Sequence, residues 1–219
     1  KSKVLYTGVM NGVLPAAPGH SHQSVRDIAL MRSVPGLDVI EPWTKQQVED
    51  TLNYYLQKET GSIYMRINPL PHSSTSLYSK LNLPEKGQGT ELLSNNNSSI
   101  SIVVHSPLFV DQAIQVVERF QKENIKINLL VASWLSQLDK EWWNNKLKNS
   151  KEIFIFENGF IQGGWTEFFI SELNSLNKNI HVHGLRDVPP CGQAQEILDD
   201  VGFSTNKIYN QISSNIKKV

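Results

Sequence analysis

Two histidines in one polar loop are the first candidates for chemistry in this sequence. His20 and His22 lie in the segment Pro-Gly-His-Ser-His-Gln, directly before a stretch with the apolar spacing of a helix. Ser24 and Asp27 stand three residues apart at the expected helix start, which predicts a capping box. Because free backbone N–H groups and the helix dipole favour an anion at such a position, the loop could hold a phosphorylated or oxyanionic substrate.

A third candidate is Arg66, which lies in the β-rich run Ile-Tyr-Met-Arg-Ile. A guanidinium can grip a phosphate through two parallel hydrogen bonds, but on a strand it can equally pair with a carboxylate. His22 also has a simpler interpretation, in which it only closes the loop at the helix start. His20 and His22 together could form a metal pair, although no cysteine or acidic partner is evident beside them to complete a ligand set.

Strands and helices alternate along most of the chain and predict an α/β fold. Strands are expected at 3–8, 37–41 and 63–67 in the first part, and at 100–105, 125–132, 152–157 and 179–184 in the second. Helical patterns separate them, so we expect three layers, with a mostly parallel sheet and helices on both faces. Thr44 and Gln47 predict a capping box at the start of the helix that precedes the strand at 63–67. The segment between the two parts is rich in Pro, Ser and Asn and is interpreted as a linker that could include one hairpin.

The charge balance and the cysteine count narrow the function classes. The chain has 21 Lys and Arg residues and 21 Asp and Glu residues, so nothing suggests an electrostatic grip on nucleic acid or on an acidic membrane surface. Cys191 is the single cysteine and has no partner for an internal disulfide. No apolar run approaches the ~20 residues of a membrane helix. We therefore expect a cytoplasmic protein with no nucleic-acid or membrane partner. Because the chain opens with Lys1, we also expect a piece of a longer protein or a processed product.

The histidine loop belongs to a longer pattern that resembles a known family. Residues 19–42 read Gly-His-Ser-His-Gln…Asp-Ile-Ala-Leu-Met-Arg…Val-Pro-Gly-Leu-Asp-Val-Ile-Glu-Pro, which is similar to the end of the pyrimidine-binding domain of transketolases. Two later segments resemble the C-terminal domain of the same enzymes. They are Phe-Ile-Phe-Glu-Asn-Gly…Gly-Gly at 154–164 and His-Gly-Leu-Arg-Asp-Val…Cys-Gly-Gln-Ala-Gln-Glu-Ile-Leu at 183–198.

This resemblance implies a division of the chain and a reaction. Residues 1–72 would be the latter part of a pyrimidine-binding domain, a partial α/β unit. Residues 73–99 would be the linker, and residues 100–219 a complete Rossmann-like C-terminal domain. Transketolases are thiamine-diphosphate enzymes that transfer a two-carbon ketol unit between phosphorylated sugars. The patterns are shared more loosely with 1-deoxyxylulose-5-phosphate synthases and with the β subunits of 2-oxo acid dehydrogenases, and both remain alternatives.

The resemblance also assigns roles to the three candidate residues. His22 falls on the family's substrate-contacting histidine, which makes it the catalytic candidate as well as a substrate-binding one. Arg66 falls on the arginine that holds the substrate phosphate. His20 replaces a proline of the family pattern and is included as the third substrate-binding candidate.

The cofactor and the partners are likewise implied by the resemblance. The complete enzyme would use thiamine diphosphate and Mg²⁺, but this chain has no Gly-Asp-Gly motif ending in Asn, the family's site for the metal and the diphosphate. We therefore expect no cofactor on this chain alone and no catalysis by it in isolation. The missing diphosphate-binding domain would lie on the same chain or on a separate subunit, and the assembly would be a homodimer. A non-catalytic dimerisation or regulatory module is the alternative from a different class.

Overall fold

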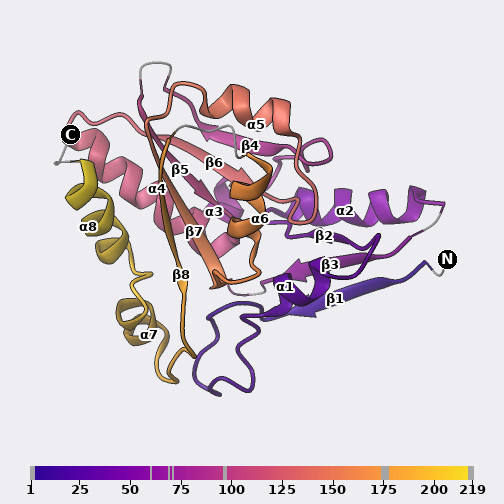
Figure 1. Cartoon of the computed structure of the whole chain (residues 1–219). Helices are drawn as coiled ribbons and strands as arrows, with labels where there is room; N and C mark the ends of the chain where they lie inside the picture. Colours follow the sequence, from indigo (N-terminus) through magenta and orange to yellow (C-terminus); the bar gives the residue numbers. More distant parts are fainter. Residues whose placement is uncertain are drawn as a thin grey trace.

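Strands and helices alternate along the computed structural model of the chain, which describes residues 3–59, 61–68, 70, 72–95, 98–173 and 178–216 (Figure 1). The strands are β1 (Leu5–Val9), β2 (Asp38–Ile40), β3 (Ile63–Ile67), β4 (Gly89–Leu93), β5 (Ile100–Val104), β6 (Asn128–Ala132), β7 (Glu152–Phe160) and β8 (Asn179–Leu185). The helices are α1 (Asp27–Arg32), α2 (Lys45–Gln57), α3 (Ser73–Leu77), α4 (Pro107–Lys122), α5 (Lys140–Leu147), α6 (Trp165–Glu172), α7 (Ala194–Asp200) and α8 (Thr205–Ile216). Across these ranges, no helix combines the length and the apolar character that crossing a bilayer requires.

The smaller sheet has three parallel strands in the order β1-β3-β2. Its helix α2 begins as predicted, because the Thr44 hydroxyl accepts a hydrogen bond from the backbone N–H of Gln47 at 3.1 Å. The Gln47 side chain reaches back to the N–H of Trp43, one residue before the cap. Tyr54 and Tyr55 of α2 then pack against the core of the sheet.

The larger sheet has five strands in the order β4-β6-β5-β7-β8. Four of them are parallel, and β5, β6 and β7 are almost continuously apolar because both of their faces are covered. One face packs against α4 and α8 and the other against α5 and α6, as the membership of the two large core clusters shows. This arrangement confirms the predicted three-layer, mostly parallel α/β fold.

The segment expected to be a linker contributes to this sheet. β4 pairs antiparallel with β6, so residues 89–93 form an edge strand, and α3 occupies another part of the segment. The strand packs through its glycine, since a Cβ on Gly89 would lie 2.6 Å from the ring of Trp143. Trp143 also donates its indole N–H to the carbonyl of Gly87. Because a glycine makes this contact, the sequence of β4 does not show the apolar pattern that predicts a strand. Residues 96 and 97 of the expected linker lie outside the described residues.

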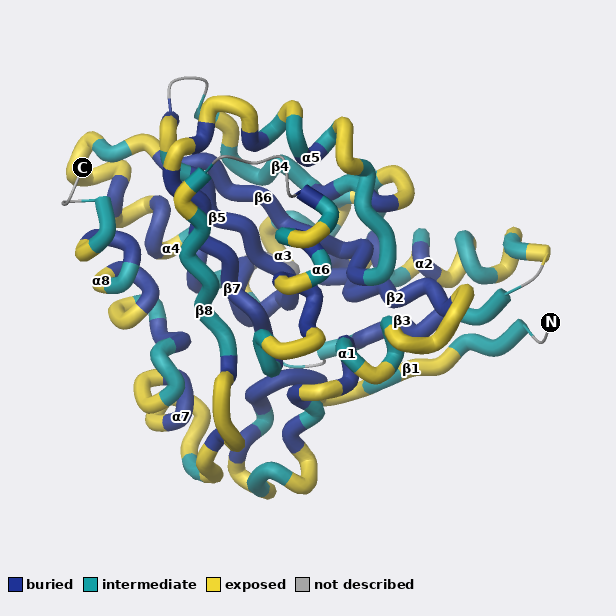
Figure 2. The backbone as a smooth tube through the Cα atoms, viewed as in Figure 1, coloured by how far each residue is buried: buried dark blue, intermediate teal, exposed yellow. Residues whose placement is uncertain are grey.

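Backbone hydrogen bonds join the two sheets. The N–H of Glu41, just after β2, donates to the carbonyl of Ser133 at 2.8 Å, and the N–H of Leu135 donates to the carbonyl of Val39 at 2.8 Å. Figure 2 shows buried backbone running from β5, β6 and β7 into β2 and β3, whereas β1 is exposed or intermediate along its length. The two sheets are therefore joined at the ends of β2 and β6.

Candidate functional site

A pocket of about 370 Å³ opens beside the loop that carries the two histidines. It is lined by His20, Ser21, His22, Gln23, Ser24, Val25, Arg26, Asp27, Leu30, Met31 and Tyr64. The loop follows the carboxyl end of β1, and ligands of open α/β sheets usually bind at the carboxyl ends of the strands. His20 and His22 are thus brought together at a position suited to binding. We call this space the histidine pocket.

The rim of the histidine pocket carries two imidazoles and a guanidinium. Arg26 donates from Nη1 to Nε2 of His20 at 3.0 Å, and its guanidinium lies 4.5 Å from the centre of the Phe160 ring. The Ser21 hydroxyl lies 3.0 Å from Nδ1 of His22 and orients that ring. All three groups can donate hydrogen bonds to an anion, and the two imidazoles can also exchange a proton with a hydroxyl group.

Asp27 forms the floor of the pocket. Its carboxylate accepts hydrogen bonds from Asn11 at 2.8 Å, from the Tyr64 hydroxyl at 2.9 Å and from Nε of Arg66 at 2.8 Å. Burial by itself would raise the pKa of Asp27, but the charge and hydrogen bonds of Arg66 outweigh it and lower that pKa. Burial and the Asp27 charge raise the pKa of Tyr64. The floor therefore holds a carboxylate and a neutral phenol.

The predicted capping box at Ser24 and Asp27 is wrong. The helix α1 begins at Asp27, its cap residue is Arg26, and that cap makes no side-chain hydrogen bond. The Asp27 carboxylate is directed to Arg66, a partner 39 residues away, instead of to the backbone at Ser24. Because α1 has only six residues, its dipole gives little support to an anion, and the case for ligand binding rests on the pocket side chains.

Arg66 does not line the histidine pocket. Its side chain is completely buried, and it donates to Asp27, to Glu41 at 2.6 Å and to the carbonyl of Asn158 at 3.0 Å. Burial would lower the pKa of the guanidinium, but the two carboxylates raise it. In this structure both carboxylates occupy donors that a phosphate would need, and the contact between Arg66 and a substrate phosphate stays a prediction.

The same ionic network continues into the larger sheet. His105 donates from Nδ1 to Glu41 at 2.7 Å and from Nε2 to Glu157 at 3.0 Å. Burial would lower the pKa of His105, but the two carboxylates raise it to about 9, so the ring is an imidazolium near neutral pH. Thr166 completes the shell of Glu157 by donating its N–H at 2.8 Å and its hydroxyl at 2.9 Å. Charges thus alternate along a buried chain, Asp27–Arg66–Glu41–His105–Glu157, which we call the ionic chain.

The sequence reasoning missed the ionic chain, although a signal was present. Glu41 and His105 each follow immediately after a strand of buried residues, and Glu157 continues the apolar core of β7. A charged residue at the end of a buried strand requires a partner, because an unpaired buried charge is costly. The parallel neighbours β5 and β7 bring His105 and Glu157 together, so this pair could have been grouped from the sequence, whereas Glu41 meets His105 from the other sheet.

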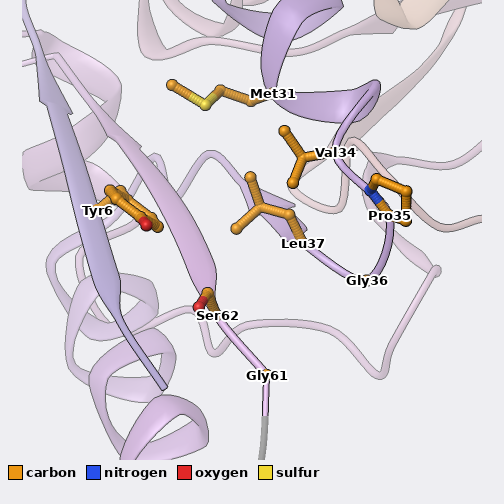
Figure 3. A pocket seen from close by; sticks show the side chains of 8 residues that line it. All are labelled: Tyr6, Met31, Val34, Pro35, Gly36, Leu37, Gly61 and Ser62. Atoms are coloured by element: carbon orange, nitrogen blue, oxygen red, sulfur yellow. The ribbon is translucent and has the colours of Figure 1, made fainter. Parts of the chain in front are cut away.

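A second pocket, of about 380 Å³, lies at the opposite ends of the small sheet (Figure 3). It is lined by Tyr6, Met31, Val34, Pro35, Gly36, Leu37, Gly61 and Ser62. Its side chains are largely apolar, and the hydroxyl groups of Tyr6 and Ser62 are the only polar side-chain groups among them. The histidine pocket, in contrast, is lined by two imidazoles and a guanidinium.

The described residues do not fit a metal ion. Within the ranges given above, no three His, Cys, Asp or Glu side chains are grouped so that they could hold one. His20 and His22 likewise have no third metal ligand beside them among those residues. No step involving a metal–diphosphate group is therefore derived from this part of the chain.

The larger sheet, its helices and the residues at the strand ends define a Rossmann-like α/β domain of the transketolase type. Residues 90–208 match the family described as "Transketolase, C-terminal domain", and this match covers more than half of the chain. The chain belongs to that family.

Curated relatives extend the similarity beyond this domain. The chain is 25% identical over 202 residues to a 1-deoxy-D-xylulose-5-phosphate synthase of Clostridium tetani, covering 89% of this chain and 31% of the relative. It is 22% identical over 212 residues to the enzyme of the same name from Bacillus velezensis, covering 95% of this chain and 33% of that one. The chain therefore spans about a third of the length of these relatives.

Solved structures share the fold of both halves. A split-gene transketolase, described as an inactive beta4 tetramer, superposes with a TM-score of 0.82 at 19% identity, covering 96% of this chain and 66% of that chain. Transketolase from Campylobacter jejuni superposes with a TM-score of 0.73 at 14% identity, covering 96% of this chain and 31% of that chain. At these identities the comparison shows the fold alone.

Proposed function

We propose that this chain is the C-terminal section of a thiamine-diphosphate enzyme that transfers a two-carbon ketol unit between phosphorylated sugars. The observation that carries the proposal is the histidine pocket, which lies at the carboxyl end of the small parallel sheet in a chain that belongs to the transketolase C-terminal family. In this assignment residues 1–72 complete a pyrimidine-binding domain that begins outside the chain.

His22 is the proposed catalytic contact. It lies on the exposed side of the histidine pocket, and the Ser21 hydroxyl beside Nδ1 leaves Nε2 to face a substrate oxygen. At that atom the imidazole would give a hydrogen bond to the substrate carbonyl or take one from its hydroxyl. Thiamine diphosphate, when bound, supplies the carbanion chemistry. The described residues offer no ligand set for Mg²⁺, so we assign the metal and the diphosphate to the missing domain, on the same polypeptide or on a partner subunit in a homodimeric assembly.

Two experiments test this proposal. The first is the intact mass of the native protein purified from its source, for which we expect either a species about three times longer or a separate partner subunit. The second measures ketol transfer by that complete protein with thiamine diphosphate and Mg²⁺. His22→Ala should lower kcat/KM about 100-fold or more. Full activity in the His22→Ala protein would refute the role of His22, and catalysis by this chain alone would refute the need for a partner.

A second candidate reaction is favoured by the names of the curated relatives. Formation of 1-deoxy-D-xylulose 5-phosphate by the complete protein, without ketol transfer between phosphorylated sugars, would establish that reaction instead. The two outcomes are read from the products of the same purified protein. The split-gene transketolase, described as inactive in its beta4 form, supports the proposal that a section of this kind lacks activity alone.

A further inference from the structure

The loop that carries the two histidines is closed at its base, where its two ends run side by side. The backbone N–H of Gly12 donates to the carbonyl of Ser24 at 2.8 Å. Residues 11–13 and 23–25 are therefore the two stems of the loop, and both histidines lie between them.

Both stems are held by the end of β7, a strand of the larger sheet. The side-chain oxygen of Asn158 accepts a hydrogen bond from the N–H of Val13 at 3.0 Å. The N–H of Phe160 donates to the carbonyl of Val25, in the other stem, at 2.9 Å. In Figure 1 the loop after β1 accordingly lies against the end of β7. One strand end thus fixes the positions of both stems.

The end of β7 is shaped for this contact. Its pairing with β8 is regular as far as Phe156 and resumes at Phe160 with a shift in register. Irregularities of this kind bend a strand and redirect its side chains, often beside functional sites. A glycine then permits the close approach, since a Cβ on Gly159 would lie 2.7 Å from the carbonyl oxygen of Val25.

Asn158 is completely buried, and both ends of its side-chain amide have a partner. The amide nitrogen donates to the Ser106 hydroxyl at 2.9 Å, which orients the side chain so that its oxygen faces Val13. Gly12 has a φ of +88°, and a Cβ there would lie 2.3 Å from the Asn158 amide nitrogen. The loop and Asn158 are therefore fitted to each other without spare room.

The contact with Val13 continues towards His22. The carbonyl of Val13 accepts a hydrogen bond from the side-chain amide of Gln23 at 3.0 Å. Gln23 is buried and directly follows His22 in the sequence. Two hydrogen bonds and one peptide unit thus connect Asn158 to the neighbour of His22, so a shift at Asn158 would displace the imidazole.

We propose that Asn158 is a positioning residue, through which the C-terminal domain sets the orientation of His22. The effect on catalysis rests on the proposed function of His22, whereas the hold of Asn158 on the loop does not. The C-terminal domain thereby acts on the chemistry of the other half, although none of its described residues lines the histidine pocket.

Amide hydrogen exchange of the full chain, measured residue by residue by NMR, tests the hold on the loop. Asn158→Ala should speed exchange at the Gly12 N–H about tenfold more than at the amides of β5, because the stems separate when Val13 loses its acceptor. Asn158→Leu keeps nearly the same volume without hydrogen-bonding groups, so the same effect would assign the change to the hydrogen bond instead of a cavity. Equal acceleration at Gly12 and in β5 would show a general loss of stability and would overturn the proposal.

Two further variants complete this test. Asn128→Ala is the matched control, because Asn128 is also buried and accepts a backbone N–H, that of Asn95 at 2.7 Å, but lies at the opposite end of the larger sheet. It should leave exchange at Gly12 unaltered relative to β5. Ser106→Ala removes only the hydroxyl that orients Asn158, and it replaces the Asn158 variants if those do not fold. It should speed exchange at Gly12 in the same direction by a smaller factor, and an unaltered rate would contradict the proposal.

The complete protein tests positioning through a double-mutant cycle on kcat/KM for the ketol transfer that it catalyses. His22→Ala alone should lower kcat/KM about 100-fold, but only about tenfold in an Asn158→Ala background, because a misplaced imidazole contributes less. A merely structural Asn158 would leave the cost of His22→Ala the same in both backgrounds. That result would overturn the inference and leave the ketol-transfer proposal intact. If His22→Ala costs nothing in either background, the proposed role of His22 fails, and hydrogen exchange still decides whether Asn158 holds the loop.

Discussion

Raising the pH through the range in which His105 loses its proton should weaken the folded chain. His105 is completely buried between Glu41 and Glu157, and their charges raise its pKa from 6.5 to about 9. A basic group whose pKa is raised by folding stabilises the native state while it is protonated there. The stabilisation is therefore complete below pH 6.5, falls as the pH rises from 6.5 towards 9, and is lost above that range.

The size of the effect follows from the difference between the two pKa values. One pKa unit corresponds to about 1.4 kcal/mol, so a rise from 6.5 to about 9 contributes roughly 3 kcal/mol to the free energy of unfolding. This is a large share of the stability of a typical domain. The slope with pH should be steepest between 6.5 and 9, where the unfolded chain has lost the proton that the folded chain retains.

Urea unfolding at pH 6, 7, 8, 9 and 10, followed by circular dichroism, measures this dependence. His105→Gln gives the background from all other titrating groups, and the difference between the two curves isolates the imidazolium. His181→Gln is the matched control, because His181 also pairs with a glutamate, Glu152, but is only partly buried and lies outside the ionic chain. Parallel curves for the unaltered chain and His105→Gln between pH 6.5 and 9 would refute the reasoning.

Two further predictions concern the effect of buried contacts on stability. Arg66→Met should lower the free energy of unfolding by about 3–5 kcal/mol, because it leaves the buried carboxylates of Asp27 and Glu41 without their cation, and a loss below 1 kcal/mol by urea unfolding would contradict that role. Gly89→Ala should cost about 1–3 kcal/mol, because the new methyl group would meet the Trp143 ring, and the cost should be smaller in a Trp143→Phe background. Equal costs in the two backgrounds would show that the ring is not the obstacle.

Local patterns predicted the elements whose reasons for forming are local. The strands β5, β6 and β7 are runs of apolar residues, and the cap of α2 needs only Thr44 and Gln47, three residues apart. The histidine pocket could also be anticipated in part, because His20 and His22 share one loop and Arg26 lies six residues from His20. The similarity to transketolases, read from ordered motifs, is confirmed by the family match.

The errors arose where a distant partner decides the structure. Asp27 resembles a capping residue locally, but its carboxylate binds Arg66 on the strand β3, and this ion pair is buried. The edge strand β4 begins with Gly89, Thr90 and Glu91 and is held by pairing with β6 and by close contact with Trp143, so its sequence resembles a loop. In each case the deciding contact joins residues that no short window contains.

The ionic chain limits how this protein can be divided or recombined. Asp27, Arg66 and Glu41 belong to the first sheet and its helix, whereas His105 and Glu157 belong to the second. A cut between the two sheets would leave Glu41 without His105 and would open the floor of the histidine pocket to water. Exchange of the C-terminal domain between relatives would therefore alter the histidine pocket of the other half, even without any change to the pocket residues. The boundary between the two halves in the sequence is therefore not a boundary in their buried ionic contacts.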